Sequence, residues 1–308
     1  MDGQRRIPDD AIWRTAGNHR GKIAAEKWPG DIDVAFQYLE SQPGVKHDMI
    51  GAGGASCGVY NSIQLARRHP EVKSLVLLSG PSGRDGRLFL QSSQNLPIFT
   101  AAADDDPFFG MTETMQWLSS VSPNAASRYA HYANGGHGAD MFAANKELPA
   151  VIVEWFSATL TNHPGSAPKT NGSVLGPQVL SALELVDQPG GATKVAETLE
   201  QARKSDPTAV LFPELDVNSL GYEHLQAGDM KGAVVIMKLN ATAYPNSPNA
   251  FDSLSDAYLA DGQKELALQN AKKTLALLAN DTVDNEQRRN LIRASSEQKM
   301  KQLDEPSH

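Results

Sequence analysis

The sequence is poor in several features that would assign it to particular protein classes. Cys57 is the only cysteine, so an intrachain disulfide is excluded. A single cysteine does not distinguish a protein of an oxidising compartment from one of a reducing compartment. No apolar run reaches the ~18 residues that cross a bilayer, and the first ten residues lack the apolar core of a signal peptide. Basic residues form no stripe and the formal net charge is −8, which argues against nucleic acid as a partner. We expect no transmembrane segment, and the sequence leaves the localisation unassigned, with the cytoplasm as the default.

Helical and strand patterns alternate along the chain from Gly30 onward. Apolar spacing predicts a helix from Gly30 to about Gln42, after a loop at residues 15–27. Apolar runs of strand length and segments of helical spacing follow, at 72–79 (strand), 96–103 (strand), 111–121 (helix), 128–133 (strand) and 148–160 (helix). This alternation favours a parallel α/β sheet, in which functional groups gather at the carboxyl ends of the strands.

The segment Gly54-Ala55-Ser56-Cys57-Gly58 is the feature around which this sheet is organised. It reads G-x-S-x-G and lies between a strand-like run at 47–53 and residues 59–68, whose apolar side chains recur at helical spacing. A serine in a sharp strand-to-helix turn, with glycines two residues away on either side, is typical of a nucleophile elbow. Ser56 is therefore the candidate nucleophile.

Cys57 competes with Ser56 for this role. A G-x-C-x-G frame would need glycine at positions 55 and 59, where the sequence has Ala55 and Val59. We expect Cys57 to contribute its backbone N–H to an oxyanion hole, as the residue after such a nucleophile does. Its side chain is expected to be a small buried apolar group.

A carboxylate and a base follow Ser56 in the chain. Three aspartates at 104–106 end one predicted strand, and His137 lies in a glycine-rich segment at the end of another. A serine hydroxyl needs a base to take its proton, and the base needs a carboxylate to orient it. The order Ser, Asp, His is that of α/β-hydrolases. We choose Asp106, in the turn leaving its strand, as the acid, and Asp105 is the alternative.

Adjacent carboxylates could also hold a metal ion. No second group with ligand spacing accompanies the aspartates in the sequence. His131, inside a predicted strand, is expected to be structural. We therefore expect neither a metal nor a cofactor.

A change of composition marks the second half of the chain. Residues 162–190 are rich in Pro, Gly, Ser, Thr and Asn, which is typical of a linker, with an ordered stretch near 180–185 and a helix near 192–203. The predicted organisation is a sheet domain at 1–165, a linker with a helix at 166–206, and a helical domain at 207–308.

A 34-residue period begins near residue 214. Leu220, Gly221, Gly228 and Ala233 return as Leu254, Ser255, Gly262 and Ala267. Such a period, with a small residue at the helix crossing, indicates two helix-turn-helix repeats, at about 214–247 and 248–281. A polar helix at 284–303 would cap the second repeat. We expect Leu220, Ala233, Leu254 and Ala267 to be buried between the two repeats.

Three segments of the first half, GASCGV, AAADDDPF and NGGHGADMF, resemble the dienelactone hydrolase-like branch of the α/β-hydrolase superfamily. The resemblance covers about residues 28–162. It implies a serine hydrolase of carboxylic esters with Ser56, Asp106 and His137 as catalytic triad. Because dienelactone hydrolases proper use cysteine at the nucleophile position, Ser56 favours ordinary esterase activity over lactone opening. The repeats resemble tetratricopeptide repeats, which usually bind peptides or mediate assembly.

The sequence departs from this family before the elbow. Only 55 residues precede Ser56, with one weak strand candidate at 11–14 and no HG or HGG motif to supply the second oxyanion donor. The resemblance therefore implies either a hydrolase core that is N-terminally truncated or one in which residues 1–27 replace the missing strands. It also implies an unpaired sheet edge beside the elbow strand, through which two copies could associate.

The leading hypothesis is an esterase acting on a small-molecule ester, with a repeat module for a peptide or protein partner. The alternative is a binding or assembly protein that acts through its repeats and whose hydrolase-like domain is non-catalytic or weakly active. A thioesterase or a peptidase could use the same three residues, since the acyl pocket cannot be read from the sequence. The presence of Ser, Asp and His at the three predicted positions favours the esterase. The short segment before Ser56 favours the binding or assembly protein.

Overall fold

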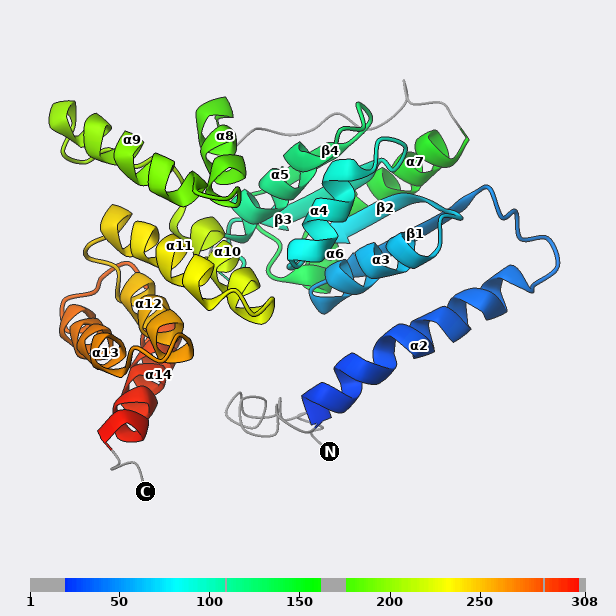
Figure 1. Ribbon diagram of the computed structural model, residues 1–308. Coiled ribbons are helices and arrows are strands. Elements are labelled where there is room, and N and C mark those ends of the chain that lie inside the picture. The colour runs from blue at the N-terminus through cyan, green and yellow to red at the C-terminus, as the bar shows by residue number, and fades with distance from the viewer. Residues whose placement is uncertain (1–19, 109, 162–175, 285, 305–308) are drawn as a thin grey trace, which may run out of the picture.

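Four parallel strands form one sheet in the order β1-β2-β3-β4 (Figure 1). The computed structural model describes residues 20–108, 110–161, 176–284 and 286–304. The strands are β1 (Ile50–Ala55), β2 (Val72–Leu78), β3 (Ile98–Ala103) and β4 (Arg128–Tyr132). Each of the three strands expected after residue 70 is therefore present, and the sheet is parallel as the alternation predicts.

Helices cover both faces of this sheet. The connections between strands are α3 (Cys57–Arg68), α4 (Arg84–Ser92) and α5 (Met111–Val121), while α7 (Leu148–Leu160) follows the short η2 (Gly138–Asp140) and α6 (Met141–Ala144). Side chains of β2 alternate between two apolar clusters. Leu75 and Leu77 join the cluster that contains α3 and α5, whereas Val76 and Leu78 join the cluster around Trp155 of α7. A strand buried on both faces explains the continuous apolar run in the sequence.

The parallel order places the carboxyl ends of all four strands at one edge of the sheet. Ser56 follows β1, Ser79 follows β2, the aspartates 104–106 follow β3, and the segment with His137 follows β4. Residues that are up to 81 positions apart in sequence thus meet at one place.

β1 lies at an edge of the sheet. Within the described residues it pairs with β2 alone, and its Gly51 and Gly53 are exposed. The unpaired edge beside the elbow strand, expected from the family resemblance, is therefore present in the described part of the chain. The strand candidate at 11–14 lies outside the described residues.

The first described helix corrects the expectation of a loop at residues 15–27. Helix α2 runs over Arg20–Glu40 and contains Pro29, which was expected to mark its start. The segment before Pro29, RGKIAAEK, is rich in strong helix formers, and this propensity outweighs the hydrogen bond that an interior proline removes. Asp33 pairs with Arg68 at 2.8 Å and with His69 at 2.9 Å. These contacts fix α2 against the C-terminal end of α3.

Seven helices follow in the described residues after 175. They are α8 (Pro177–Val186), α9 (Gly191–Ser205), α10 (Glu214–Gln226), α11 (Met230–Ala243), α12 (Pro248–Ala260), α13 (Lys264–Leu278) and α14 (Glu286–Asp304). The stretch expected as a linker is therefore largely helical from residue 177 onward. The first residues of α10 and α12 are 34 positions apart (248 − 214), and so are those of α11 and α13 (264 − 230). The observed helices thus follow the period of the sequence.

The apolar core continues from the sheet into these helices. One cluster contains Leu77 of β2 and Leu118 of α5 together with Leu199 of α9 and Leu220 of α10. A third apolar cluster joins α11, α12 and α13, and it includes Leu254. All four residues expected to be buried between the repeats are buried, but Leu220 belongs to the core shared with the sheet. Helix α10 therefore packs on both regions.

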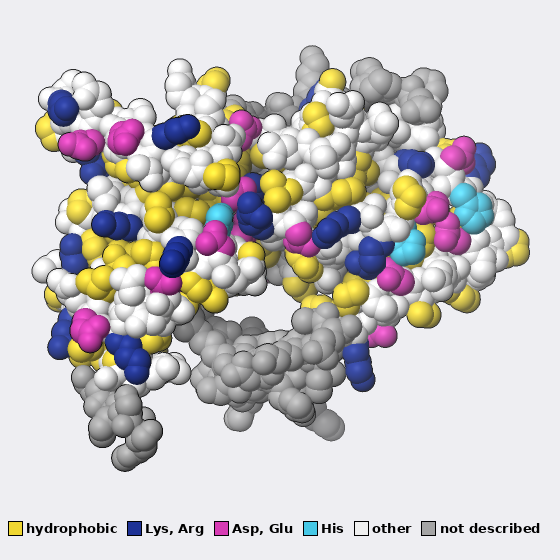
Figure 2. All heavy atoms as spheres, viewed as in Figure 1, with side chains coloured by type: hydrophobic (Ala, Val, Ile, Leu, Met, Phe, Trp, Pro, Cys, Tyr) yellow, Lys and Arg dark blue, Asp and Glu magenta, His cyan; other side chains and the backbone are white. Residues whose placement is uncertain are grey.

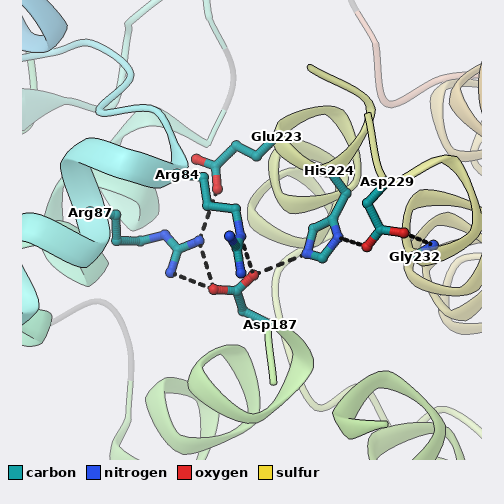
Figure 3. Close-up of polar contacts among 7 residues, drawn as sticks. All are labelled: Arg84, Arg87, Asp187, Glu223, His224, Asp229 and Gly232. Carbon is teal, nitrogen blue, oxygen red and sulfur yellow. Dashed lines mark hydrogen bonds and ion pairs between the residues drawn. The ribbon is translucent and has the colours of Figure 1, made fainter. Parts of the chain in front are cut away.

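Charged side chains hold the helices against the sheet region (Figure 3). Arg87 of α4 donates to Asp187, which follows α8, at 3.1 Å and to Glu223 of α10 at 2.9 Å. Arg84 and His224 also contact Asp187, at 3.2 and 3.1 Å. Burial opposes the charge of Asp187, but the hydrogen bond from His224 and the charges of Arg87 and Arg84 outweigh it and lower the pKa of Asp187 to about 2. We call these five residues, with Asp229, the latch.

His224 is the central donor of the latch. Its Nε2 faces Asp187 at 3.1 Å and its Nδ1 faces Asp229 at 2.8 Å. Asp229 in turn accepts from the backbone N–H of Gly232 at 2.9 Å and caps α11. The hydrogen bond with Asp187 raises the pKa of His224, and Asp229 adds to this effect while burial opposes it. With carboxylates on both nitrogens, the imidazole is favoured as a cation.

The outer surface carries charges of both signs. Figure 2 shows basic and acidic side chains interspersed over the face in view, with no continuous basic stripe there. Among the described helices, none is long and apolar enough to cross a membrane.

Candidate active site

Ser56 occupies a strained turn between β1 and α3. Its φ of 56° and ψ of −126° are uncommon for any residue with a side chain. Gly54 is required for this turn, because a Cβ there would lie 2.0 Å from the carbonyl oxygen of Gly58. The N–H of Ser56 donates to the carbonyls of Leu78 and Ser79 at 3.0 and 3.1 Å, which ties the turn to the end of β2. Strain held by the surrounding backbone in this way is common at functional sites.

His137 lies between Ser56 and Asp106. Its Nε2 is 2.8 Å from the Oγ of Ser56, and its Nδ1 is 3.0 Å from Oδ2 of Asp106. Asp106 is buried, with 2 % of its side chain exposed. The structure thus brings together the three residues that the sequence selects, from the ends of three strands. A proton on Nδ1, facing the carboxylate, leaves Nε2 free to accept the proton of the serine.

The three consecutive aspartates have three different partners. Asp106 faces His137, and its Oδ1 also accepts from the backbone N–H of Phe108 at 2.8 Å. Asp105, the alternative acid, instead accepts from the N–H groups of Gly135 and Gly136, both at 2.7 Å. It therefore holds the backbone of the segment that carries His137. Asp104 pairs with His131 at 2.6 Å, so His131 has the structural contact expected for it.

Two residues that the sequence analysis did not select also contact this group. The ring of Phe108 packs on the imidazole of His137 with centroids 4.5 Å apart, and it is 58 % exposed. The hydroxyl of the fully buried Ser79 donates to Asp106 and lies 3.1 Å from Nδ1 of His137. Ser79 could have been found from the rule that functional groups follow the strand ends, since it comes directly after β2.

Cys57 is the first residue of α3, and its side chain is exposed. The expectation of a buried thiol is therefore wrong, because the first turn of α3 points this side chain outward while Val59 and Ile63 face the core. Its backbone N–H is among the first four of the helix, which have no partner within the helix. This amide, next to Ser56, can therefore point at an oxyanion, which the positive end of the helix dipole also favours.

A second oxyanion donor does not come from the middle of α2. Asp33 and Phe36 of α2 contact Arg68 and His69 at the C-terminal end of α3. Ser56 lies at the opposite end of α3, a helix of 12 residues, which is about 18 Å long at 1.5 Å per residue. Among the described residues, the backbone N–H of Cys57 is the candidate oxyanion donor, because it follows Ser56 at the start of α3.

Comparison with protein families adds to this geometry. Residues 3–154 match the model of the dienelactone hydrolase family. The matched range includes all three residues that meet at the strand ends, and it supports an α/β-hydrolase-type domain with a hydrolase activity of the ester-cleaving kind. The helices from α8 onward lie outside it. Among curated proteins, none matches the chain.

The described residues contain no group of three or more His, Cys, Asp or Glu side chains that could hold a metal ion. The aspartates at 104–106 diverge toward separate partners, as described above.

Proposed function

We propose that this protein is a serine hydrolase of carboxylic esters, with Ser56 as nucleophile, His137 as general base and acid, and Asp106 as the orienting carboxylate. The observation that carries the proposal is the pair of contacts made by His137, 2.8 Å to the serine oxygen and 3.0 Å to the carboxylate. Such contacts are within the range in which a base activates a nucleophile. The hydrolase family match supports the same class of chemistry.

The first half of the reaction forms an acyl-enzyme. The Oγ of Ser56 attacks the ester carbonyl carbon while its proton passes to Nε2 of His137. The carbonyl oxygen takes the negative charge and accepts a hydrogen bond from the backbone N–H of Cys57. The bond to the alcohol then breaks, and Nε2 of His137 returns its proton to the leaving oxygen.

The second half releases the acid. Water enters beside His137, gives its proton to Nε2 and attacks the acyl carbon. The new intermediate collapses by breaking the bond to Ser56, whose oxygen takes the proton back from His137. Asp106 stays ionised throughout and stabilises the imidazolium that forms in each half.

Hydrolysis of p-nitrophenyl acetate by purified protein tests this assignment. Ser56→Ala and His137→Gln should each lower kcat by roughly 10⁴-fold or more, because removing either member of a triad disables the whole. Asp106→Asn should also cost a large factor, since it leaves the imidazole in the wrong tautomer. Equal activity of wild type and Ser56→Ala would remove the proposal and favour the non-catalytic binding protein.

The Asp105→Asn variant is the matched control for the choice of acid. An asparagine oxygen can still accept from the N–H groups of Gly135 and Gly136. We therefore expect Asp105→Asn to retain most of its activity, whereas Asp106→Asn does not. The opposite ranking would make Asp105 the acid.

The oxyanion site sets the preferred leaving group. Loss of one oxyanion donor costs about 10²–10³ in turnover where it has been measured by mutagenesis. If Cys57 is the single donor, activated aryl esters should be cleaved much faster than alkyl esters. Ordinary rates on alkyl esters would mean that a further donor completes the site.

We also propose that α10–α13 form two tetratricopeptide-type repeats that bind a peptide or protein partner. The 34-residue offset between corresponding helix starts supports this proposal. Gly228 and Gly262, also 34 apart, both adopt positive φ at the turns inside the pairs. A peptide-binding screen with the full-length protein tests it, and failure to capture any peptide would contradict it.

A further inference from the structure

Ser79 contacts every member of the proposed triad, although it lies outside all of the segments that resemble a hydrolase motif. Its carbonyl accepts the N–H of Ser56 at 3.1 Å. Its hydroxyl donates to Oδ2 of Asp106 and lies 3.1 Å from Nδ1 of His137. One residue at the end of β2 thus connects the nucleophile, the base and the acid.

The conformation of Ser79 is costly for a residue with a side chain. Its φ is 47°, and it shares positive φ only with Ser56 among the described residues other than glycine. The following residue, Gly80, has no room for a side chain, because a Cβ there would lie 2.1 Å from the carbonyl oxygen of Ser56. A glycine at position 79 would relieve the strain, so a strained serine in contact with the triad points to a use for its hydroxyl.

The donors and acceptors around the hydroxyl of Ser79 indicate what it does. The hydroxyl proton of Ser79 goes to Asp106, which leaves lone pairs of the oxygen toward His137. Nδ1 of His137 can approach Ser79 only as a donor in this arrangement, so the hydroxyl selects the tautomer with the proton on Nδ1. The N–H of Phe108 fixes the other carboxylate oxygen of Asp106 at 2.8 Å.

We propose that Ser79 is a positioning residue that holds the carboxylate of Asp106 in place and keeps the proton of the His137 imidazole on Nδ1. The proposal rests on the function proposed above, since it assigns a role within the same site. The hydroxyl of Ser79 contacts Asp106 and Nδ1 of His137, whereas the proton in the reaction passes between Oγ of Ser56 and Nε2 of His137. Ser79 acts through the orientation of the base.

Paired variants separate the hydroxyl from the backbone. Ser79→Ala keeps the Cβ and the strain, while Ser79→Gly removes both and suits a φ of 47°. We expect kcat on p-nitrophenyl acetate to fall in both variants by roughly 10- to 100-fold, the factor that one hydrogen bond to a charged group supplies. KM should change little, because binding of the ester is not affected.

Ser74→Ala is the matched control. Ser74 is a fully buried serine of the same strand, and its hydroxyl accepts from Thr159 at 2.8 Å, away from the site. This variant should keep the kcat of wild type. Ser79→Cys, which keeps the volume but is a weak donor, replaces any Ser79 variant whose melting curve shows that it does not fold.

A readout independent of turnover is the low-field proton NMR resonance of the Nδ1–H of His137, assigned by its absence in His137→Gln. It should shift or broaden in both Ser79 variants and stay unchanged in Ser74→Ala. Wild-type kcat in Ser79→Gly would overturn the proposal, because the hydroxyl would then be dispensable. An unchanged resonance in both variants would overturn it as well. If wild type shows no Ser56-dependent turnover, the proposed function fails, and the resonance still decides the role of Ser79.

Discussion

Two histidines among the described residues lie in charged hydrogen-bond networks, and they differ in the group that faces the second ring nitrogen. His224 of the latch has a carboxylate on each nitrogen, Asp187 at 3.1 Å and Asp229 at 2.8 Å. His137 has a carboxylate on Nδ1 and the hydroxyl of Ser56 on Nε2. Both nitrogens of His224 must donate, so it is held as a cation. Only one nitrogen of His137 must donate, so the other remains free to take a proton.

The two networks also differ in what positions them. The residues around His137 follow the ends of strands, where backbone contacts fix the turns. The latch residues lie on α4, α10 and the ends of α8 and α11, so they join elements that could otherwise separate. This difference predicts that changes in the latch alter stability, whereas changes at the strand ends alter turnover.

The largest effect on stability is expected from Arg87→Ala. This change removes the buried cation that Asp187 and Glu223 share, and removing one partner of a buried ion pair in this way costs about 3–5 kcal/mol. Urea unfolding monitored by circular dichroism measures the loss. Arg67→Ala is the control, because its partner Asp85 is 45 % exposed, and such pairs contribute about 0–1 kcal/mol. Equal losses in the two variants would show that the latch does not hold the helices.

The next largest effect on stability is expected in the apolar cluster of α11, α12 and α13. Leu254→Ala should cost about 2–5 kcal/mol, because the residue is buried in the cluster of α11, α12 and α13. Leu266→Ala on the outer side of α13, where the side chain is 38 % exposed, should change the melting temperature little. An unchanged melting temperature in Leu254→Ala would contradict the packing of these helices.

Asp216 is a third buried ionisable group, and it predicts how the stability of the helices on the sheet depends on pH. It lies on α10, accepts from Thr114 of α5 at 2.8 Å and is fully buried. Burial raises the pKa of Asp216 to about 7. The folded protein then holds a proton that the unfolded chain releases near its ordinary value of about 4. The contribution of Asp216 to stability should therefore fall with rising pH between about 4 and 7, by up to about 1.4 kcal/mol per pH unit.

Asp216→Asn tests this expectation. The variant lacks the titrating group, so its free energy of unfolding should vary less between pH 4 and 7 and exceed that of wild type at neutral pH. Urea titrations at several pH values give both curves. Parallel curves for the two proteins would rule out the buried, protonated carboxyl.

The smallest effect is the pH dependence of the latch. Because its hydrogen bond to Asp187 raises the pKa of His224 above the unfolded value of 6.5, its stabilising contribution is complete below pH 6.5 and is lost as pH rises through the raised value. The stability difference between wild type and His224→Gln should therefore shrink at alkaline pH. His137→Gln provides the contrast, with turnover lost while the unfolding free energy changes little. A difference for His224→Gln that does not vary with pH would contradict the account.

The strand ends could be predicted from the sequence because their signals are local. Ser56 lies between two glycines, and His137 lies among glycines after a strand, so residue type and spacing sufficed. The choice of Asp106 over Asp105 rested on the turn that leaves β3. The buried side chain expected of Cys57 was wrong, because the pattern did not indicate which way the first turn of α3 faces.

The latch could not be predicted, because its partners are up to 136 residues apart and no motif links them. Helix α4 carries Arg84 and Arg87 but was not recognised in the sequence, since its Gly86 and few apolar residues give a weak pattern. Helix α2 begins before the residue that the pattern predicts, because Pro29, a common start signal, lies inside the helix. The repeat period was visible, whereas the sharing of Leu220 with the sheet core depends on tertiary packing.

Labelling with a fluorophosphonate probe, followed by peptide mapping, tests the central claim most directly. Such a probe reacts with a serine only where a base activates it, and the account predicts one adduct, on Ser56, in wild type. The adduct should be absent in Ser56→Ala and strongly slowed in His137→Gln, while Arg87→Ala should still label at temperatures where it is folded. An adduct on another residue, or equal labelling in His137→Gln, would contradict the assignment of Ser56 as a nucleophile activated by His137.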